Sequence, residues 1–204
     1  MDSGYHLFTL GTSRKKIAPD HLLNDSLVRK RRIVLYKIED VLKSLKEAFK
    51  FLTGFRRKRV LILSIRSQNV VLQELRRIKK ENRFISYFAH KWVAGFLTNS
   101  RVVKHNAESV KSFKSQNSLR VYQRIYEGVT SLKGLPHLLI VIGGNLCNVA
   151  IKEALSMNIP VIALRDTDAR FTKDVVPIFT NASDVRIHLL LLRWIERNLN
   201  HNAS

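Results

Sequence analysis

A strand–helix–strand pattern between residues 137 and 164 restricts the fold of this chain more than any other segment. Residues 137–142 and 161–164 are short, almost wholly apolar runs, and the residues between them repeat with helical spacing. The apolar face of that predicted helix consists of Leu146, Val149, Ala150, Ala154 and Leu155. Continuous apolar strands are typical of parallel sheets, because helices cover both faces of such sheets. The segment therefore predicts a parallel βαβ unit.

The same patterns recur along the rest of the chain. We expect strands at residues 33–38, 60–65 and 84–88, and helices at residues 39–52 and 67–81. The last predicted helix buries a stripe formed by Val185, Leu189, Leu192 and Ile195, and either Ser183 or Asn181 is a suitable N-cap. This order predicts a three-layer, mostly parallel α/β domain of the flavodoxin-like or Rossmann-like kind, with helices on both faces of the sheet.

Three segments flank or interrupt this domain, which we expect to span residues 33–200. Residues 1–32 are irregular in pattern and rich in arginine and lysine, which indicates a basic N-terminal arm. Residues 101–134 are polar and basic with few apolar positions, and they predict a helical insert that projects from the sheet. Residues 201–204 form a short tail.

The net charge of +20 at pH 7 is far larger than solubility requires, and it is unevenly distributed. Residues 1–137 hold 29 Lys and Arg against 10 Asp and Glu, whereas residues 138–204 hold 7 against 6. A positive field of this size indicates a polyanionic partner, either nucleic acid or an anionic membrane surface. We find no amphipathic anchoring helix, so we expect nucleic acid and no membrane.

Several classes of site are not indicated by the sequence. Cys147 is the only cysteine, so the chain cannot form an internal disulfide, and we expect this thiol to be buried. The histidines are scattered without metal-ligand spacing, and we predict no metal site. The acidic residues show no pairing for acid–base catalysis, and no nucleophile motif is present. We therefore predict no catalytic residues, no cofactor and no small-molecule substrate.

One alternative stays open at the carboxyl edge of the predicted sheet, where loops of α/β proteins usually bind ligands. Gly143, Gly144 and Asn145 follow one strand, and Asp166 follows the next. The phosphate-binding patterns G-x-G-x-x-G and G-x-x-x-x-G-K-[ST] are both absent. A small enzyme or a nucleotide- or sugar-phosphate-binding protein that uses Gly143 and Asp166 is the alternative function.

Three stretches together resemble the universal small-subunit ribosomal protein two family. Residues 91–99, Lys-Trp-Val-Ala-Gly-Phe-Leu-Thr-Asn, resemble its signature of a basic residue, Trp, small residues and Leu-Thr-Asn. Residues 135–142 resemble its Leu-Pro-Asp-hydrophobic strand. Residues 152–154 and 158–167 resemble its Glu-Ala, Ile-Pro and Asp-Thr series. Roughly residues 30–200 align with the family by eye.

The chain also departs from that family. Gly143 stands where the family's strand usually ends in Asp, and residues 177–183 differ from its Pro-Ile-Pro-Gly-Asn-Asp-Asp stretch. The N-terminal Gly-x-His-x-Gly-His pattern is not recognisable, and the helical insert looks shortened. Together with the high charge, these departures resemble a mitochondrial version of the family, so we expect the small ribosomal subunit of the mitochondrial matrix as its location.

The resemblance implies a non-catalytic, structural component of the small ribosomal subunit, near the junction of head and body. Its implied partners are small-subunit ribosomal RNA and neighbouring ribosomal proteins. Basic side chains would neutralise RNA phosphates while the sheet domain holds them in place. Our candidate RNA contacts are Arg14, Lys15, Lys16, Arg29, Lys30, Arg31, Arg32, Arg56, Arg57, Lys58, Arg59, Lys91, Arg101 and Lys104. The candidate structural-loop residues are Trp92, Gly95, Thr98 and Asn99.

Overall fold

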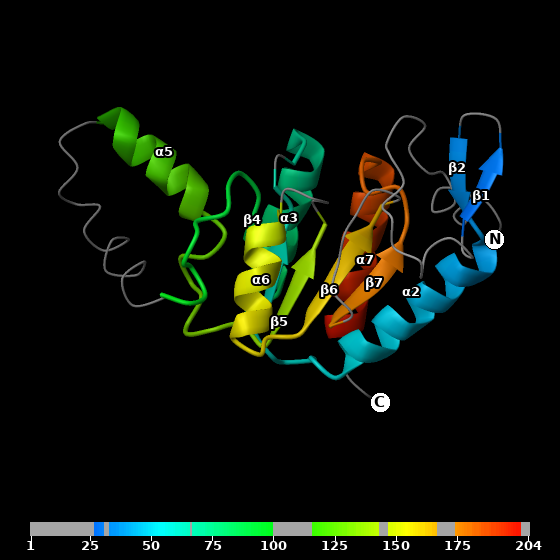
Figure 1. Cartoon of the computed structure of the whole chain (residues 1–204). Helices are drawn as coiled ribbons and strands as arrows, with labels where there is room; N and C mark the ends of the chain where they lie inside the picture. Colours follow the sequence, from blue (N-terminus) through cyan, green and yellow to red (C-terminus); the bar gives the residue numbers. More distant parts are fainter. Residues whose placement is uncertain are drawn as a thin grey trace.

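A five-stranded, wholly parallel sheet forms the centre of the computed structural model (Figure 1). The structure describes residues 27–30, 33–65, 67–99, 116–142, 147–166 and 174–200. The strands lie in the order β4-β3-β5-β6-β7. Their bounds are β3 Val60–Leu63, β4 Ile85–Phe88, β5 Leu138–Val141, β6 Val161–Arg165 and β7 Val175–Phe179. The parallel α/β fold class predicted from the sequence is confirmed.

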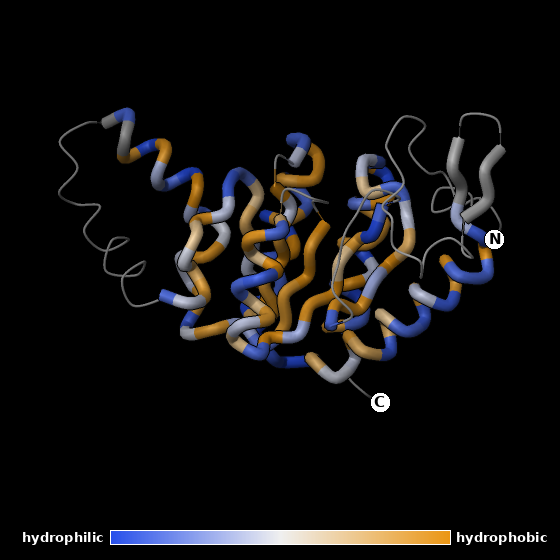
Figure 2. Tube along the Cα trace, viewed as in Figure 1, coloured by the Kyte–Doolittle hydropathy of each residue, from blue (hydrophilic) through white to orange (hydrophobic). Residues whose placement is uncertain are grey.

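Helices cover both faces of this sheet. On one face lie α2 (Ile38–Thr53), α3 (Asn69–Glu81) and α7 (Val185–Asn200), which bury Leu45, Leu75 and Leu192 in a common core. On the other face, α6 (Asn148–Ser156) packs with the segments that follow β4 and α5, and this second core contains the buried Cys147. Every residue of β3, β4 and β5 is buried, and the sequences of β3 and β5 are continuously apolar (Figure 2).

The helix α5 (Gln116–Tyr126) falls within the predicted insert and projects away from the sheet (Figure 1). Only its C-terminal end contacts the domain, where the ring of Tyr126 meets Phe88. Val121 is exposed on its surface. Residues 101–115, the first part of the predicted insert, lie outside the described residues.

The predicted first strand does not join the main sheet. β2 (Ile33–Tyr36) is shorter than the expected 33–38, and it pairs antiparallel with β1 (Leu27–Lys30) in a separate two-stranded sheet. Only two residues separate β1 from β2, so this local pairing costs little loop-closure entropy compared with a long-range pairing. β1 lies within the segment expected to be an arm.

The N-cap of the last helix also differs from the prediction. Asp184, rather than Ser183 or Asn181, accepts the backbone N–H of Arg186 through Oδ1 at 2.9 Å, and its carbonyl accepts the N–H of His188. Asn181 instead accepts the N–H of Ser183 in a tight turn before the helix. Asp184 is favoured because its charge also complements the positive N-terminal end of the helix dipole.

Candidate nucleic-acid interface

Five of the candidate RNA contacts have described side chains: Arg56, Arg57, Lys58, Arg59 and Lys91. Arg29 and Lys30 are placed only as backbone, in β1. The remaining candidates, Arg14, Lys15, Lys16, Arg31, Arg32, Arg101 and Lys104, lie outside the described residues. The structure thus brings four candidates together in one turn and places Lys91 elsewhere, after β4.

The four cations at residues 56–59, which we name the basic turn, connect α2 to β3. Arg56 donates from Nε to the carbonyl of Asn198 near the end of α7, at 2.9 Å. Arg59 donates from Nε to the carbonyl of Leu135 at 2.8 Å. The side chains of Arg57 and Lys58 are exposed between these two anchored arginines. The turn therefore holds two guanidinium groups in place and presents two further cations to solvent.

The basic turn lies at the amino edge of the sheet, which we define as the segments that precede β3, β4 and β5. Arg83 precedes β4, and its guanidinium lies 5.0 Å from the ring centre of Phe84. His137 precedes β5, and its Nδ1 accepts the backbone N–H of Arg59 at 3.2 Å. Burial, and then the positive charges of Arg59 and Lys58, lower the pKa of His137. His137 thus lies close to the two cations Lys58 and Arg59 at this edge.

A second arrangement fixes the loop at residues 90–99, which we name the Trp92 loop. The carboxylate of Glu153 on α6 accepts three N–H groups from it: Trp92 Nε1 at 3.1 Å, the Gly95 amide at 2.8 Å and the Leu97 amide at 3.2 Å. A carboxylate can accept several such bonds, and its charge strengthens each one. Glu153 therefore determines the loop's conformation from another element, 58 residues away from Gly95 in sequence.

The apolar residues of the Trp92 loop are anchored in the second core. Trp92 is only 7% exposed, Leu97 is buried, and Phe88 makes edge-to-face contacts with Trp92 and Phe96. Gly95 has a φ of +82°, a left-handed conformation that favours glycine. The loop consequently exposes Lys91, Thr98 and Asn99 on a fixed backbone.

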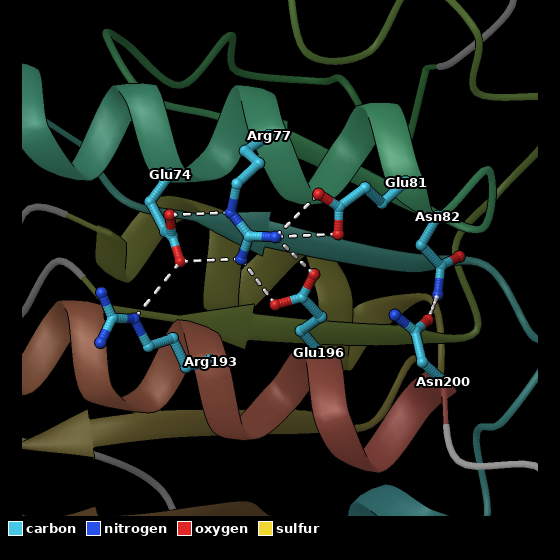
Figure 3. A network of polar contacts seen from close by, with 7 residues as sticks. All are labelled: Glu74, Arg77, Glu81, Asn82, Arg193, Glu196 and Asn200. Atoms are coloured by element: carbon cyan, nitrogen blue, oxygen red, sulfur yellow. Dashed lines mark hydrogen bonds and ion pairs between the residues drawn. The ribbon is translucent and has the colours of Figure 1, made fainter.

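Many of the other cations are neutralised within the protein. Arg77 on α3 binds Glu74, Glu81 and Glu196 through its guanidinium, with N–O distances of 2.7–2.9 Å, and so joins α3 to α7 (Figure 3). The hydrogen bond from Arg77 lowers the pKa of Glu74. Beside this network, Asn82 Nδ2 donates to Oδ1 of Asn200 at the ends of the same two helices (Figure 3).

A smaller network neutralises Arg76. Its guanidinium donates to both carboxylate oxygens of Glu127, which also accepts the hydroxyl of Tyr87. Lys79 donates to the backbone carbonyl of Glu127 at 3.0 Å. The hydrogen bond from Arg76 lowers the pKa of Glu127. Arg76, Arg77 and Lys79 therefore serve the fold and leave the basic turn as the main described cluster of surface cations.

The structure describes only part of the carboxyl edge, where the alternative function would bind its ligand. Gly143, Gly144 and Asn145 lie outside the described residues, and the Asp166 side chain is only 1% exposed. Within the described ranges, no group of three or more His, Cys, Asp or Glu residues could hold a metal ion. No helix in the part of the chain that the structure covers has the length and apolar character needed to cross a membrane.

Comparison with known proteins decides the family. Residues 9–201 match the model of the family described as ribosomal protein S2. The chain belongs to the ribosomal protein S2 family. This assignment confirms the resemblance carried by residues 91–99, 135–142 and 152–167.

Among S2-family relatives, the small ribosomal subunit protein uS2 of Mycoplasmoides gallisepticum is 28% identical over 168 residues, which cover 74% of this chain and 52% of the relative. The protein of the same name from Shewanella piezotolerans is 24% identical over 154 residues, covering 66% and 63%. That of Shewanella baltica is 31% identical over 101 residues, covering 41% and 42%. The matched region thus spans less than two thirds of each of these S2 proteins.

The structure connects two of the S2-like motifs that the sequence left separate. In the sequence, Glu153 was noted only as part of a Glu-Ala series. In the structure, its carboxylate accepts hydrogen bonds from the Trp92 loop directly. Arg83 was also not among the candidates, because a single cation before a strand has no distinctive pattern. The signal for Glu153 was its charge: it is one of only 6 acidic residues after residue 137.

Proposed function

We propose that the chain is a structural, non-catalytic component of the small ribosomal subunit, where it binds ribosomal RNA and neighbouring ribosomal proteins near the junction of head and body. The observation that carries this proposal is the S2-family match over residues 9–201. The relatives are named small ribosomal subunit proteins. The net charge of +20 fits a chain that contacts polyanionic RNA.

The basic turn supports this role at the level of residues. Arg56, Lys58 and Arg59 form no ion pair with an acidic residue in the described ranges, while Arg76 and Arg77 do. Cations that the fold does not neutralise attract phosphate groups and release counterions on binding. The Trp92 loop would add Lys91 on a backbone that Glu153 holds in place.

We place this function in the mitochondrial matrix. The proposal is supported by the chain's departures from the family's usual sequence, namely Gly143, residues 177–183 and the lost N-terminal histidine pattern. Localisation of a tagged chain by cell fractionation tests it: we expect recovery with mitochondrial ribosomes, and recovery with cytosolic or plastid ribosomes would contradict it.

Binding to purified small subunits tests the ribosomal role. We expect the chain to co-sediment with small subunits at low salt and to be released progressively as salt rises. The absence of any co-sedimentation at low salt would contradict the proposal. A thermal-shift screen with nucleotides and sugar phosphates tests the alternative at Gly143 and Asp166, which predicts several degrees of stabilisation by one ligand.

A further inference from the structure

The amino edge of the sheet collects cations from three loops that are distant in sequence. β4, β3 and β5 are adjacent and parallel, with Val60 opposite both Ile85 and Leu138. The basic turn, Arg83 and the exposed Lys133 precede these three strands, so they converge on one side of the molecule. Two strand spacings amount to about 10 Å. A duplex carries about one charge per 1.7 Å of its axis, so an edge of this width faces several phosphates.

The side chains of Arg56 and Arg59 are held in one position before any phosphate binds. Arg56 and Arg59 each use Nε for a backbone carbonyl, which leaves the four Nη N–H groups of each guanidinium beyond that bond. A side chain that is already ordered loses less conformational entropy when it binds. The guanidinium of Arg59 also lies over Gly134, whose φ of +87° lets the chain turn beneath it.

Arg57 occupies a backbone conformation that favours glycine. Its φ is +58°, in the left-handed region where a side chain beyond Cβ is disfavoured. Glycine would fit this turn with less strain, yet the position carries an exposed arginine. Non-glycine residues in such conformations are concentrated at functional sites, where the side chain compensates for the strain. Arg57 is therefore a marker of function in the basic turn.

Two acids close to these cations or to their hydrogen-bond partners are bound to another residue. Glu81 lies two residues before Arg83, and Glu196 lies two residues before Asn198, but both are bound to Arg77. Asp174 precedes β7, which is two strands away from β5. Within the described ranges, Arg56, Lys58 and Arg59 form no ion pair with an acidic residue, so these three charges can attract an anionic partner.

We propose that the amino edge, formed by the basic turn together with Arg83 and Lys133, is the surface on which this chain binds the sugar-phosphate backbone of duplex RNA. This inference rests on the proposed ribosomal function and adds the surface and the groups that recognise the partner. Fixed guanidinium forks match phosphate oxygens by geometry, and A-form RNA is recognised mainly through its shape and backbone. An anionic membrane would need only loosely placed charge together with apolar insertion, so RNA is the better fit.

The test compares two doubly substituted full-length chains of equal net charge. The first, Arg57→Gly with Lys58→Gln, removes two exposed cations from the basic turn and relieves the left-handed strain at Arg57. The control, Lys43→Gln with Lys46→Gln, removes two exposed lysines from α2. Binding to an RNA duplex of about 20 base pairs is measured over a series of salt concentrations, because each lost phosphate contact lowers the salt slope by about one unit.

We expect the basic-turn variant to lose about two units of slope in the plot of log K against log salt, while its thermal midpoint stays at or above the wild-type value because the strain at Arg57 is relieved. The control should change the slope by less than half as much. Equal slopes for the two variants would overturn the inference, as would a wild-type chain without affinity for the duplex. Phosphatidylserine vesicles form a second arm: if only vesicle binding responds to the basic-turn variant, the edge is a membrane surface and the inference is wrong.

Small-subunit co-sedimentation separates this inference from the function on which it rests. If wild type and both variants co-sediment alike, the ribosomal role stands and the amino edge is not its RNA contact. If wild type does not co-sediment at all, the proposed function itself fails.

Discussion

Replacing Glu153 by glutamine tests whether one carboxylate fixes the Trp92 loop. In the native chain, Oε1 accepts Trp92 Nε1–H and the Gly95 amide, and Oε2 accepts the Leu97 amide. A glutamine oxygen at the Oε1 position keeps two of these bonds without the charge. Its NH₂ group then faces the amide N–H of Leu97, donor against donor, because the amide offers only one acceptor oxygen.

The expected loss of folding free energy in Glu153→Gln follows from these three hydrogen bonds. A hydrogen bond to a charged group contributes about 1.5–3 kcal/mol, and a donor left without a partner costs about 1–3 kcal/mol. Glu153 is partly exposed, so water offsets some of this cost, and we expect about 2 kcal/mol for Glu153→Gln. For a chain of this size, that loss lowers the thermal midpoint by roughly 4–8 °C. Glu153→Ala removes both acceptor oxygens and so breaks all three hydrogen bonds, and it should cost more, about 3–4 kcal/mol.

The assay is chemical unfolding followed by tryptophan fluorescence in a Trp194→Phe background, in which Trp92 is the single reporter. We expect Glu153→Gln to shift the emission of the folded state as well as the unfolding midpoint. Lys152→Gln, an exposed neighbour on α6, is the control and should stay within about 0.5 kcal/mol. An unchanged folded-state emission with an unfolding free energy equal to that of the control would refute the role of Glu153.

Three further outcomes are expected. Gly128→Ala should destabilise the fold by about 3 kcal/mol or more in urea unfolding, since its Cβ would lie 1.9 Å from the carbonyl oxygen of Tyr87; an effect below about 1 kcal/mol would contradict this close approach. Arg77→Met should lower the free energy of unfolding by about 1–2 kcal/mol, because Arg77 is 42% exposed but joins three glutamates. Arg186→Met breaks a single surface ion pair, and an equal loss in the two variants would show that the network adds no stability. Burial lowers the pKa of His188 below its ordinary value of 6.5, so the unfolded state binds the proton more readily. The free energy of unfolding should therefore fall as pH drops below about 6.5. In His188→Gln the dependence of the unfolding free energy on pH should be weaker, and an unchanged dependence would exclude this histidine as the cause.

Local patterns in the sequence predicted most of the fold. The helical stripe of Val41, Leu45 and Leu52 and the apolar runs of β3 and β5 are properties of consecutive residues, so they can be read without knowing what packs against them. Trp92, which the sequence suggested as a structural-loop residue, is only 7% exposed.

Contacts between distant residues could not be predicted in this way. Arg77 and Glu196 are 119 residues apart, and neither position has a pattern that identifies the other. The partnership of Glu153 with Trp92 has the same origin, since it depends on how α6 packs beside the loop. The hairpin of β1 and β2 was missed for a different reason: its first strand contains Arg29 and Lys30, whose charges match a basic arm as well as a strand.

For the candidate RNA site too, local patterns could be predicted from the sequence and long-range contacts could not. Composition indicated a polyanionic partner, and the cluster at residues 56–59 was visible as a run of cations. Which cations the fold neutralises was not visible, because Arg76 and Arg77 differ from Arg56 and Arg59 only in their three-dimensional neighbours. Sequence charge alone therefore overestimates the surface available to RNA.

Sedimentation of the chain in a native extract tests the proposed ribosomal role most directly. A tagged full-length chain is followed through a density gradient at low salt and again at high salt, alongside the small-subunit RNA. We predict that the chain co-migrates with the small subunit at low salt and moves toward the top of the gradient as salt rises. A chain that stays at the top of the gradient at low salt, apart from small-subunit RNA, would contradict that role.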